Sequence, residues 1–245
     1  MAQSMSDLAL LVPELILAGM ALALILAARR IRKTPVAAVG TVLAAMAAAL
    51  ASGWVLSWGA KTGFGGMITL DGYSQFFKVL IAATLALATL LSVRSLDGEQ
   101  VPRAEYHALL LLASTGMMLA VSSRDLLPLW LGLELMTLCS YILVGIRVER
   151  PASNEAAIKY FLLGSFASAV LIYGISLTYG VTGTTDFEGI ASALSKHSAG
   201  SNLLLLAAMG LVAAGLAFKV AAVPLHAWAP EAYQGASAPD RKSVV

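Results

Sequence analysis

Long apolar stretches separated by short polar segments dominate the chain. Stretches of about 18 residues or more occur at 8–28, 36–58, 75–93, 105–122, 126–146, 157–179 and 203–223. A helix of such a length, rising about 1.5 Å per residue, crosses a hydrocarbon layer of roughly 30 Å. Spanning segments must satisfy their own backbone hydrogen bonds, and these lack the alternation of a β-barrel strand. The pattern therefore predicts an all-α, polytopic transmembrane bundle of about seven helices.

Two of the connecting segments are longer than the others. Residues 59–74 contain several glycines, which favour turns, and residues 67–70 within them are predicted to form a short strand on the membrane surface. Residues 180–202 are polar and rich in serine and threonine. We interpret this second segment as a solvated connection rather than a ligand site.

The composition excludes an ordinary soluble enzyme. Of the 245 residues, 59% are hydrophobic and only 12% are charged, against about 25% in a typical soluble domain. The one cysteine, Cys139, excludes a disulfide framework and any cysteine-ligated zinc or iron–sulfur site built from this chain alone. The net charge of +2 is too small to indicate a nucleic-acid surface.

Basic residues set the expected orientation. No basic residue precedes the first span, whereas Arg29, Arg30, Arg32 and Lys33 follow it, so this span is a retained helix rather than a signal peptide. The positive-inside rule then places the 29–35 loop in the cytoplasm and the N-terminus outside. Alternation along the chain gives eight basic residues in inside loops and three in outside loops, which agrees with this choice.

Two charged residues lie where a membrane span should carry none. Glu134 is the ninth residue of the stretch 126–146, and Lys219 lies deep in the last stretch, five residues before Pro224. A charge near the bilayer centre costs about 2.5–3.5 kcal/mol, so each needs a reason. Proline has no backbone N–H, so we expect a helix break at Pro224 that leaves the Val220 carbonyl free beside the lysine.

Glu134 and Lys219 have two interpretations. They form either a static ion pair that joins two helices or a proton-relay pair. Burial lowers the pKa of a lysine and raises that of a glutamate by up to roughly 3–5 units, and a nearby opposite charge acts in the reverse direction, so bringing the partners together or apart changes their proton affinity. A change of about 3 pKa units is roughly 4 kcal/mol, comparable with the work of moving one charge across about 180 mV, so such a pair could take part in proton pumping.

Other ionisable residues leave similar alternatives open. Lys159 follows Glu155 by four residues, so it forms an i, i+4 surface pair or belongs to the relay. We interpret Lys78 as an interfacial anchor at the start of its span. Glu14 and His226 each face a partner helix or a water path.

Several strings resemble one family of membrane subunits. They are DGYSQFFKVL (71–80), LPLWLGLELMTLCSYILVG (127–145), NEAAIKYFLLGSFASAVLIYGISLTYGVTGTTDF (154–187) and GLAFKVAAVPLHAWAPEAYQGA (215–236). These strings resemble subunit N of the proton-pumping NADH:quinone oxidoreductase, respiratory complex I. Subunits L and M and the large subunits of multi-subunit cation/proton antiporters share the glutamate helix and the broken lysine helix.

The resemblance implies a fourteen-helix antiporter-like subunit built from two inverted five-helix units. Glu134 matches the glutamate of the family's fifth helix, and Lys219 matches the lysine of the seventh. Lys159 matches the lysine that opens the sixth helix, and His226 matches the histidine that follows the break. These residues are the proposed proton relay, with the roles of Lys159 and His226 less firmly assigned by the family.

The resemblance also divides the chain. Residues 1–104 correspond to an N-terminal three-helix region, 105–239 to an incomplete first proton-channel unit, and 240–245 to a tail that does not follow the family. The family continues after Pro239 into an eighth helix, which these last residues do not begin. We therefore expect an N-terminal fragment, ended by a frameshift, a truncation or an assembly error, that cannot pump protons alone.

The expected function is proton translocation in the cell inner membrane, coupled to NADH oxidation and quinone reduction in other subunits. NADH, FMN, iron–sulfur clusters and quinone would be bound by those membrane and peripheral partners, with no cofactor, metal or redox site in this chain and no nucleic acid bound. The alternatives are a subunit of a multi-subunit cation/proton antiporter and, in another class, a seven-helix receptor or a structural anchor.

Overall fold

The computed structural model describes residues 7–29, 35–96, 101–196 and 203–236. Helical backbone makes up nearly all of it, beginning with a single turn at residues 7–10. The helices are α2 (Val12–Ala27), α3 (Pro35–Leu56), α4 (Gly72–Ser95), α5 (Arg103–Val121), α6 (Leu126–Val144), α7 (Pro151–Thr182), α8 (Phe187–Lys196), α9 (Leu203–Lys219) and α10 (Trp228–Gly235). The remaining elements are strands β1 (Lys61–Gly63) and β2 (Ile68–Leu70), joined by a 3₁₀ turn at Phe64–Gly66.

Each of the seven predicted spans coincides with a helix. Within the described ranges, α3, α4, α5, α6 and α7 are long and apolar enough to cross a membrane, while α2 and α9 are apolar but shorter. The all-α, polytopic prediction is confirmed. α7 is longer than predicted: its 32 residues extend about 48 Å, so its first turns reach beyond a hydrocarbon layer of roughly 30 Å.

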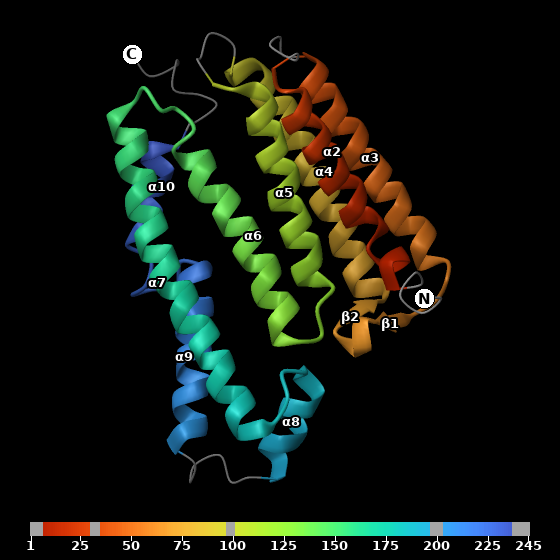
Figure 1. Ribbon diagram of the computed structural model, residues 1–245, viewed down its shortest axis with the longest axis vertical. Helices are drawn as coiled ribbons and strands as arrows, with labels where there is room; N and C mark the ends of the chain where they lie inside the picture. The colour runs from red at the N-terminus through yellow and green to blue at the C-terminus, as the bar shows by residue number, and fades with distance from the viewer. Residues whose placement is uncertain (1–6, 30–34, 97–100, 197–202, 237–245) are drawn as a thin grey trace.

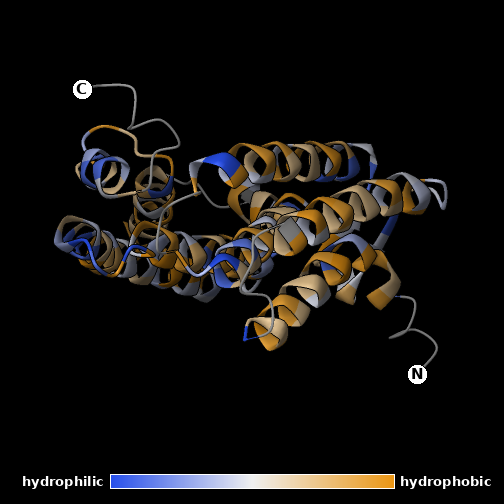
Figure 2. Ribbon diagram, turned by 90° about the horizontal axis from the view of Figure 1, so that it is seen from above, coloured by the Kyte–Doolittle hydropathy of each residue, from blue (hydrophilic) through white to orange (hydrophobic). Residues whose placement is uncertain are grey.

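The helices pack into two groups that meet at α5 and α6 (Figure 1). α2 packs against α3 and α5, and α4 packs against α3 and α5. α6 lies between α5 and α7, and α7 also packs against α9 and α10. Figure 2 shows that these helices are predominantly apolar, and large apolar side chains such as Leu50, Leu91 and Phe166 are exposed. Lipid is the medium in which such a surface is stable.

Two glycines bring α5 and α6 close together. A Cβ added at Gly116 would lie 2.5 Å from the Gly132 carbonyl oxygen, and one added at Gly132 would lie 2.6 Å from the Gly116 oxygen. Only glycine permits this backbone approach, which is the usual role of small residues between membrane helices. The contact fixes α6, the helix of Glu134, against the N-terminal group.

Three connecting segments meet at one end of the molecule. The Thr69 N–H donates to the Ser122 carbonyl at 2.8 Å, and the Arg124 N–H donates to the Met67 carbonyl at 2.8 Å. The Leu126 N–H donates to Thr185 at 3.0 Å. The predicted strand near residues 67–70 is confirmed as β2, which pairs antiparallel with β1. The segments predicted to share one membrane side therefore share one end of the fold.

The connection predicted at residues 180–202 contains regular structure in the part that the structure describes, which the sequence did not predict. α7 continues to Thr182, and α8 occupies Phe187–Lys196. Ile190 of α8 packs against a cluster that includes Leu126 and Ile175. The serine and threonine content hid an amphipathic helix, whose apolar residues cover the ends of α6 and α7.

Three further predictions fall outside the described residues, wholly or in part. They concern the N-terminus and the basic cluster beyond Arg29, the end of the segment 180–202, and the tail 240–245.

The interpretation of Lys78 as an interfacial anchor is also wrong. Its Nζ lies 2.7 Å from Oε1 of Glu14, and the two side chains are only 1% and 5% exposed. α4 begins before the apolar run, at Gly72, and Lys78 shares the buried face of this helix with Gln75 and Ala82. Hydropathy located the start of the span but not the face of the helix on which the lysine lies.

Candidate functional site

Glu134 lies near the middle of α6, a helix of 19 residues. Its side chain is 22% exposed. The Ser168 hydroxyl of α7 donates a hydrogen bond to Oε2 of Glu134, and Ser168 itself is buried. The carboxylate is therefore held between α6 and α7, away from the ends of both helices.

Lys219 is the last residue of α9, and the helix ends there in a Schellman motif. The Ala222 N–H donates to the Ala217 carbonyl at 2.9 Å, and the Ala221 N–H donates to the Phe218 carbonyl at 3.0 Å. Ala221 adopts a φ of 52°, a left-handed conformation that costs an alanine roughly 1–2 kcal/mol. The sequence predicted a break at Pro224, whereas the helix already ends at Lys219, five residues earlier.

α10 supports this helix end. The Trp228 indole N–H donates to the Phe218 carbonyl at 3.1 Å, as a second donor beside the Ala221 N–H. The same indole stacks on Tyr160 of α7, with ring centroids 4.5 Å apart. These contacts fix the direction of the chain beyond Lys219.

The structure brings the two predicted residues together. Lys219 Nζ lies 3.5 Å from Glu134 Oε2 and 3.0 Å from the Thr137 hydroxyl oxygen, and the lysine side chain is only 4% exposed. The Thr137 hydroxyl donates to the Leu133 carbonyl at 2.9 Å, so it accepts from the ammonium. Lys219 therefore has a neutral partner and an anionic partner within reach of one side-chain movement.

Lys159 lies apart from this pair. Its Nζ is 2.9 Å from Glu155 Oε1 and 3.2 Å from Glu231 Oε2, and its side chain is 47% exposed. The i, i+4 pair with Glu155 is confirmed. Glu231 lies in the first turn of α10, so Lys159 connects the start of α7 to the segment that follows the break.

His226 lies in the turn between α9 and α10, with an exposed side chain. Its backbone carbonyl accepts from the Ala229 N–H at 2.9 Å. Its imidazole makes no hydrogen bond or ion pair with any residue that the structure describes. The predicted site residues thus occupy three places: the Glu134–Lys219 pair, the Lys159 cluster and the His226 turn.

Comparisons with known proteins agree with this arrangement. Residues 123–241, which contain the pair, match the family model for the membrane domain of "NADH:quinone oxidoreductase/Mrp antiporter" proteins. The NADH-quinone oxidoreductase subunit N of Paramagnetospirillum magneticum is 40% identical over 240 residues, which are 95% of this chain and 49% of that protein. The chain belongs to this family.

Two solved structures extend the likeness to the fold. A chain of respiratory complex I from Thermus thermophilus has a TM-score of 0.69 and 31% identity, and the alignment covers 91% of this chain and 47% of that one. A chain of the Mrp complex from Dietzia sp. has a TM-score of 0.66 and 26% identity over 93% of this chain and 44% of that one. The chain spans about half the length of the family members that it matches.

Sequence reasoning missed three contacts of the site. Thr137 lies three residues after Glu134 on the same helix face, a spacing that the sequence does contain. Ser168 carries only the weak signal of a small polar residue in an apolar span. Glu231 lies in the string 215–236, but its pairing with Lys159 depends on the packing of α10 against α7, which the sequence does not reveal.

No group of three or more His, Cys, Asp or Glu residues in the described ranges is placed to hold a metal ion. Cys139 is buried within α6.

Proposed function

We propose that this chain forms part of the proton path of a membrane subunit in an NADH:quinone oxidoreductase of the complex I type. The observation that carries the proposal is the Glu134–Lys219 pair, which lies inside the bundle at the end of a broken helix. A charge at this depth is costly, and broken helices at membrane depth occur where they line protein or a water-filled cavity. The family membership supports the same conclusion.

The geometry supports a simple relay step. A protonated Lys219 is drawn toward the Glu134 carboxylate at 3.5 Å, while the Thr137 hydroxyl at 3.0 Å offers a partner that carries no charge. The Ser168 hydroxyl donates to the same carboxylate oxygen, Oε2, that faces Lys219. A shift of the ammonium between its two partners changes its proton affinity, because only one partner is charged.

The work of pumping can be expressed as a change in proton affinity. A change of about 3 pKa units corresponds to roughly 4 kcal/mol, which equals the work of moving one charge across about 180 mV. We place NADH oxidation and quinone reduction in other subunits, which would bind NADH, FMN, the iron–sulfur clusters and the quinone. The partners of this chain would be those membrane and peripheral subunits and the surrounding lipid of the cell inner membrane.

Lys159 and His226 remain proposals for further members of the proton relay. Lys159 bridges α7 and α10 through Glu231, next to the broken segment that carries His226. We also propose the division at residue 104 between the N-terminal helices and the channel unit, with α5 as the first helix of that unit.

A cation/proton antiporter is the second candidate. The likeness to the Mrp complex favours it, because that chain aligns over nearly the same share of this one. The driving force separates the two functions: an oxidoreductase subunit moves protons when NADH is oxidised, and an antiporter moves them when a sodium gradient is imposed.

Substitution of Lys219 tests the proposal. In inverted membrane vesicles, we expect Lys219→Ala to reduce NADH-driven proton uptake by roughly tenfold or more, because a positioned acid or base contributes about 10²–10⁴ to a proton-transfer step. Lys219→Arg keeps the positive partner of Glu134 but does not release its proton, so it should lose less. Parental uptake in both variants would leave Lys219 a structural role, and uptake driven only by a sodium gradient would favour the antiporter.

We propose that the N-terminus and the 59–74 and 180–202 segments face the outside and that the 29–35 and 147–156 segments face the cytoplasm. Cysteines introduced at exposed positions, Thr62→Cys in β1 and Val148→Cys after α6, test the orientation. A membrane-impermeant thiol reagent should label Thr62→Cys from the outside and Val148→Cys from the cytoplasmic side. Labelling from the opposite sides would reverse the whole orientation.

A further inference from the structure

We infer that the Tyr141 hydroxyl is a water-binding step on the proton route, between the Glu134–Lys219 pair and the membrane end at which α7 begins. This inference rests on the proposed proton function of that pair. Tyr141 lies on α6, one turn beyond Thr137, and its side chain is buried. Its hydroxyl oxygen makes no hydrogen bond within the described structure.

An unpartnered buried hydroxyl needs an explanation. Leaving such a group without a partner destabilises a fold, and phenylalanine fills nearly the same space without this penalty. Polar groups left unpaired inside proteins commonly bind water. Packing alone therefore does not account for the hydroxyl group of Tyr141, whereas a bound water molecule would.

The hydroxyl lies between α6 and α7, at a place that α7 leaves open. A Cβ added at Gly164 would overlap the hydroxyl oxygen of Tyr141. The ring is held from the side by Tyr160, whose centroid lies 4.6 Å away at an angle of 88°. Gly164 therefore makes room for the phenol oxygen, and Tyr160 fixes the ring.

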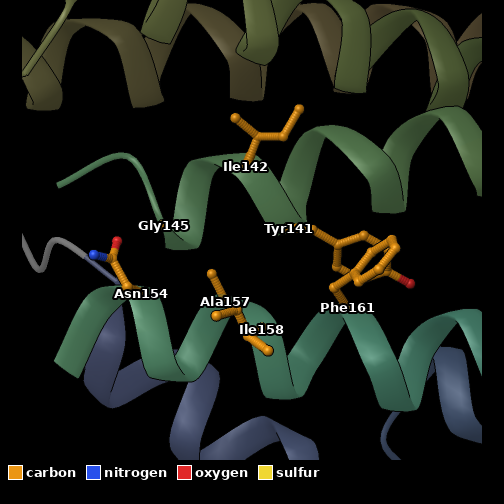
Figure 3. Close-up of a pocket in the computed structure, with 7 residues that line it drawn as sticks. All are labelled: Tyr141, Ile142, Gly145, Asn154, Ala157, Ile158 and Phe161. Atoms are coloured by element: carbon orange, nitrogen blue, oxygen red, sulfur yellow. The ribbon is translucent and has the colours of Figure 1, made fainter. Parts of the chain in front are cut away.

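The position of Tyr141 along the helices places it between two features. Toward the Glu134–Lys219 pair, one helical turn from Tyr141 and from Gly164, lie Thr137 of α6 and Ser168 of α7. On the near side is a groove of about 490 Å³ between the ends of α6 and α7, which begins at Asn154 and Gly145 and ends at Tyr141 and Phe161 (Figure 3). Tyr141 separates this groove from the Glu134–Lys219 pair.

Thr137 has capacity for one more hydrogen bond. A hydroxyl has one donor and two acceptor positions. The donor of Thr137 is directed to the Leu133 carbonyl, and one acceptor position takes the Lys219 ammonium. The remaining lone pair can accept from a water molecule that also contacts the Tyr141 hydroxyl.

The proton step balances without any other reactant. A protonated water (H₃O⁺) on the groove side gives a proton to the phenol oxygen and becomes neutral water, while the phenol gives its own proton to the water on the Thr137 side, which becomes H₃O⁺. Tyr141 is neutral before and after the step, and one proton has moved toward Lys219.

The test is Tyr141→Phe in the chromosomal gene, measured in the assembled complex. Because the hydroxyl makes no hydrogen bond in the structure, we expect the amount and thermal stability of the complex to remain unchanged. Proton uptake per complex should fall about fivefold, which at 1.36 kcal/mol per tenfold corresponds to one hydrogen bond of about 1 kcal/mol. The solvent deuterium isotope effect on uptake should rise, which a packing defect would not cause.

Tyr173→Phe is the matched control, since Tyr173 lies on α7 with an exposed side chain. It should leave uptake unchanged. Gly164→Ala should reduce uptake as Tyr141→Phe does, because the added methyl group displaces the phenol oxygen. Normal uptake per complex in Tyr141→Phe would overturn the inference. If Glu134→Gln also pumped normally, the proposed function itself would fail, so the two failures are distinguishable.

Discussion

Glu134→Gln is expected to reduce NADH-driven proton uptake by tenfold or more while the complex still assembles. Glutamine keeps the volume of the side chain and can still accept from the Ser168 hydroxyl, so the α6–α7 contact survives. It cannot pair ionically with Lys219 or exchange a proton. A positioned acid or base contributes about 10²–10⁴ to proton transfer, so the loss should be large. Uptake into inverted vesicles, normalised to the amount of complex, measures it.

Glu188→Gln provides a control of the same chemistry. Glu188 pairs with Arg124 in an exposed position near the start of α6, so the change removes an ion-paired carboxylate without touching the bundle interior. It should leave proton uptake unchanged. If Glu134→Gln pumps like the parent at normal complex levels, the Glu134–Lys219 pair is only a structural contact.

Breaking the Glu14–Lys78 pair is expected to have the largest effect on stability. The two side chains are 5% and 1% exposed, so Lys78→Met leaves a buried carboxylate without its counter-ion. Removing one partner of a buried pair costs about 3–5 kcal/mol, a large share of the roughly 5–15 kcal/mol that stabilises a typical domain. Membranes from the variant should contain much less of the subunit, as measured by quantitative immunoblotting and thermal unfolding.

The double variant Glu14→Leu with Lys78→Met should recover most of the loss. Well-packed apolar side chains often replace a buried ion pair at no cost in stability. Glu188→Gln is again the control, because an exposed pair contributes only about 0–1 kcal/mol. A double variant as deficient as Lys78→Met alone would show that the pair does more than balance charge between α2 and α4.

The sequence identified the central pair because an ionised side chain in a long apolar run is conspicuous. Glu134 and Lys219 each interrupt such a run, and the structure brings them together as the expected pair. Thr137 and Ser168 did not stand out, because small hydroxyl residues occur throughout membrane helices and bond their own backbone there. Their part in the site depends on which residue of another helix lies opposite.

The helix break shows the same limit. Pro224 predicted that α9 would be interrupted, and it is, but the interruption begins at Lys219. The left-handed Ala221 and the indole of Trp228 decide the end of the helix. Neither residue is a strong stop signal in the sequence. Glycine usually occupies the left-handed position that Ala221 takes here, and Trp228 acts through a contact with Phe218, ten residues earlier in the chain.

What the sequence determined by itself was the positions of the seven apolar helices, their approximate ends and the two charges that needed explanation. These depend on hydropathy summed over about 18 residues, which the local sequence contains in full. Only the tertiary structure decided which buried groups meet: Lys78 with Glu14 rather than with the interface, Lys159 with Glu231, and Tyr141 opposite Gly164. Such pairings depend on the rotation of each helix about its axis and on close packing between helices, and a chain uniformly apolar on its lipid and protein faces does not specify that rotation.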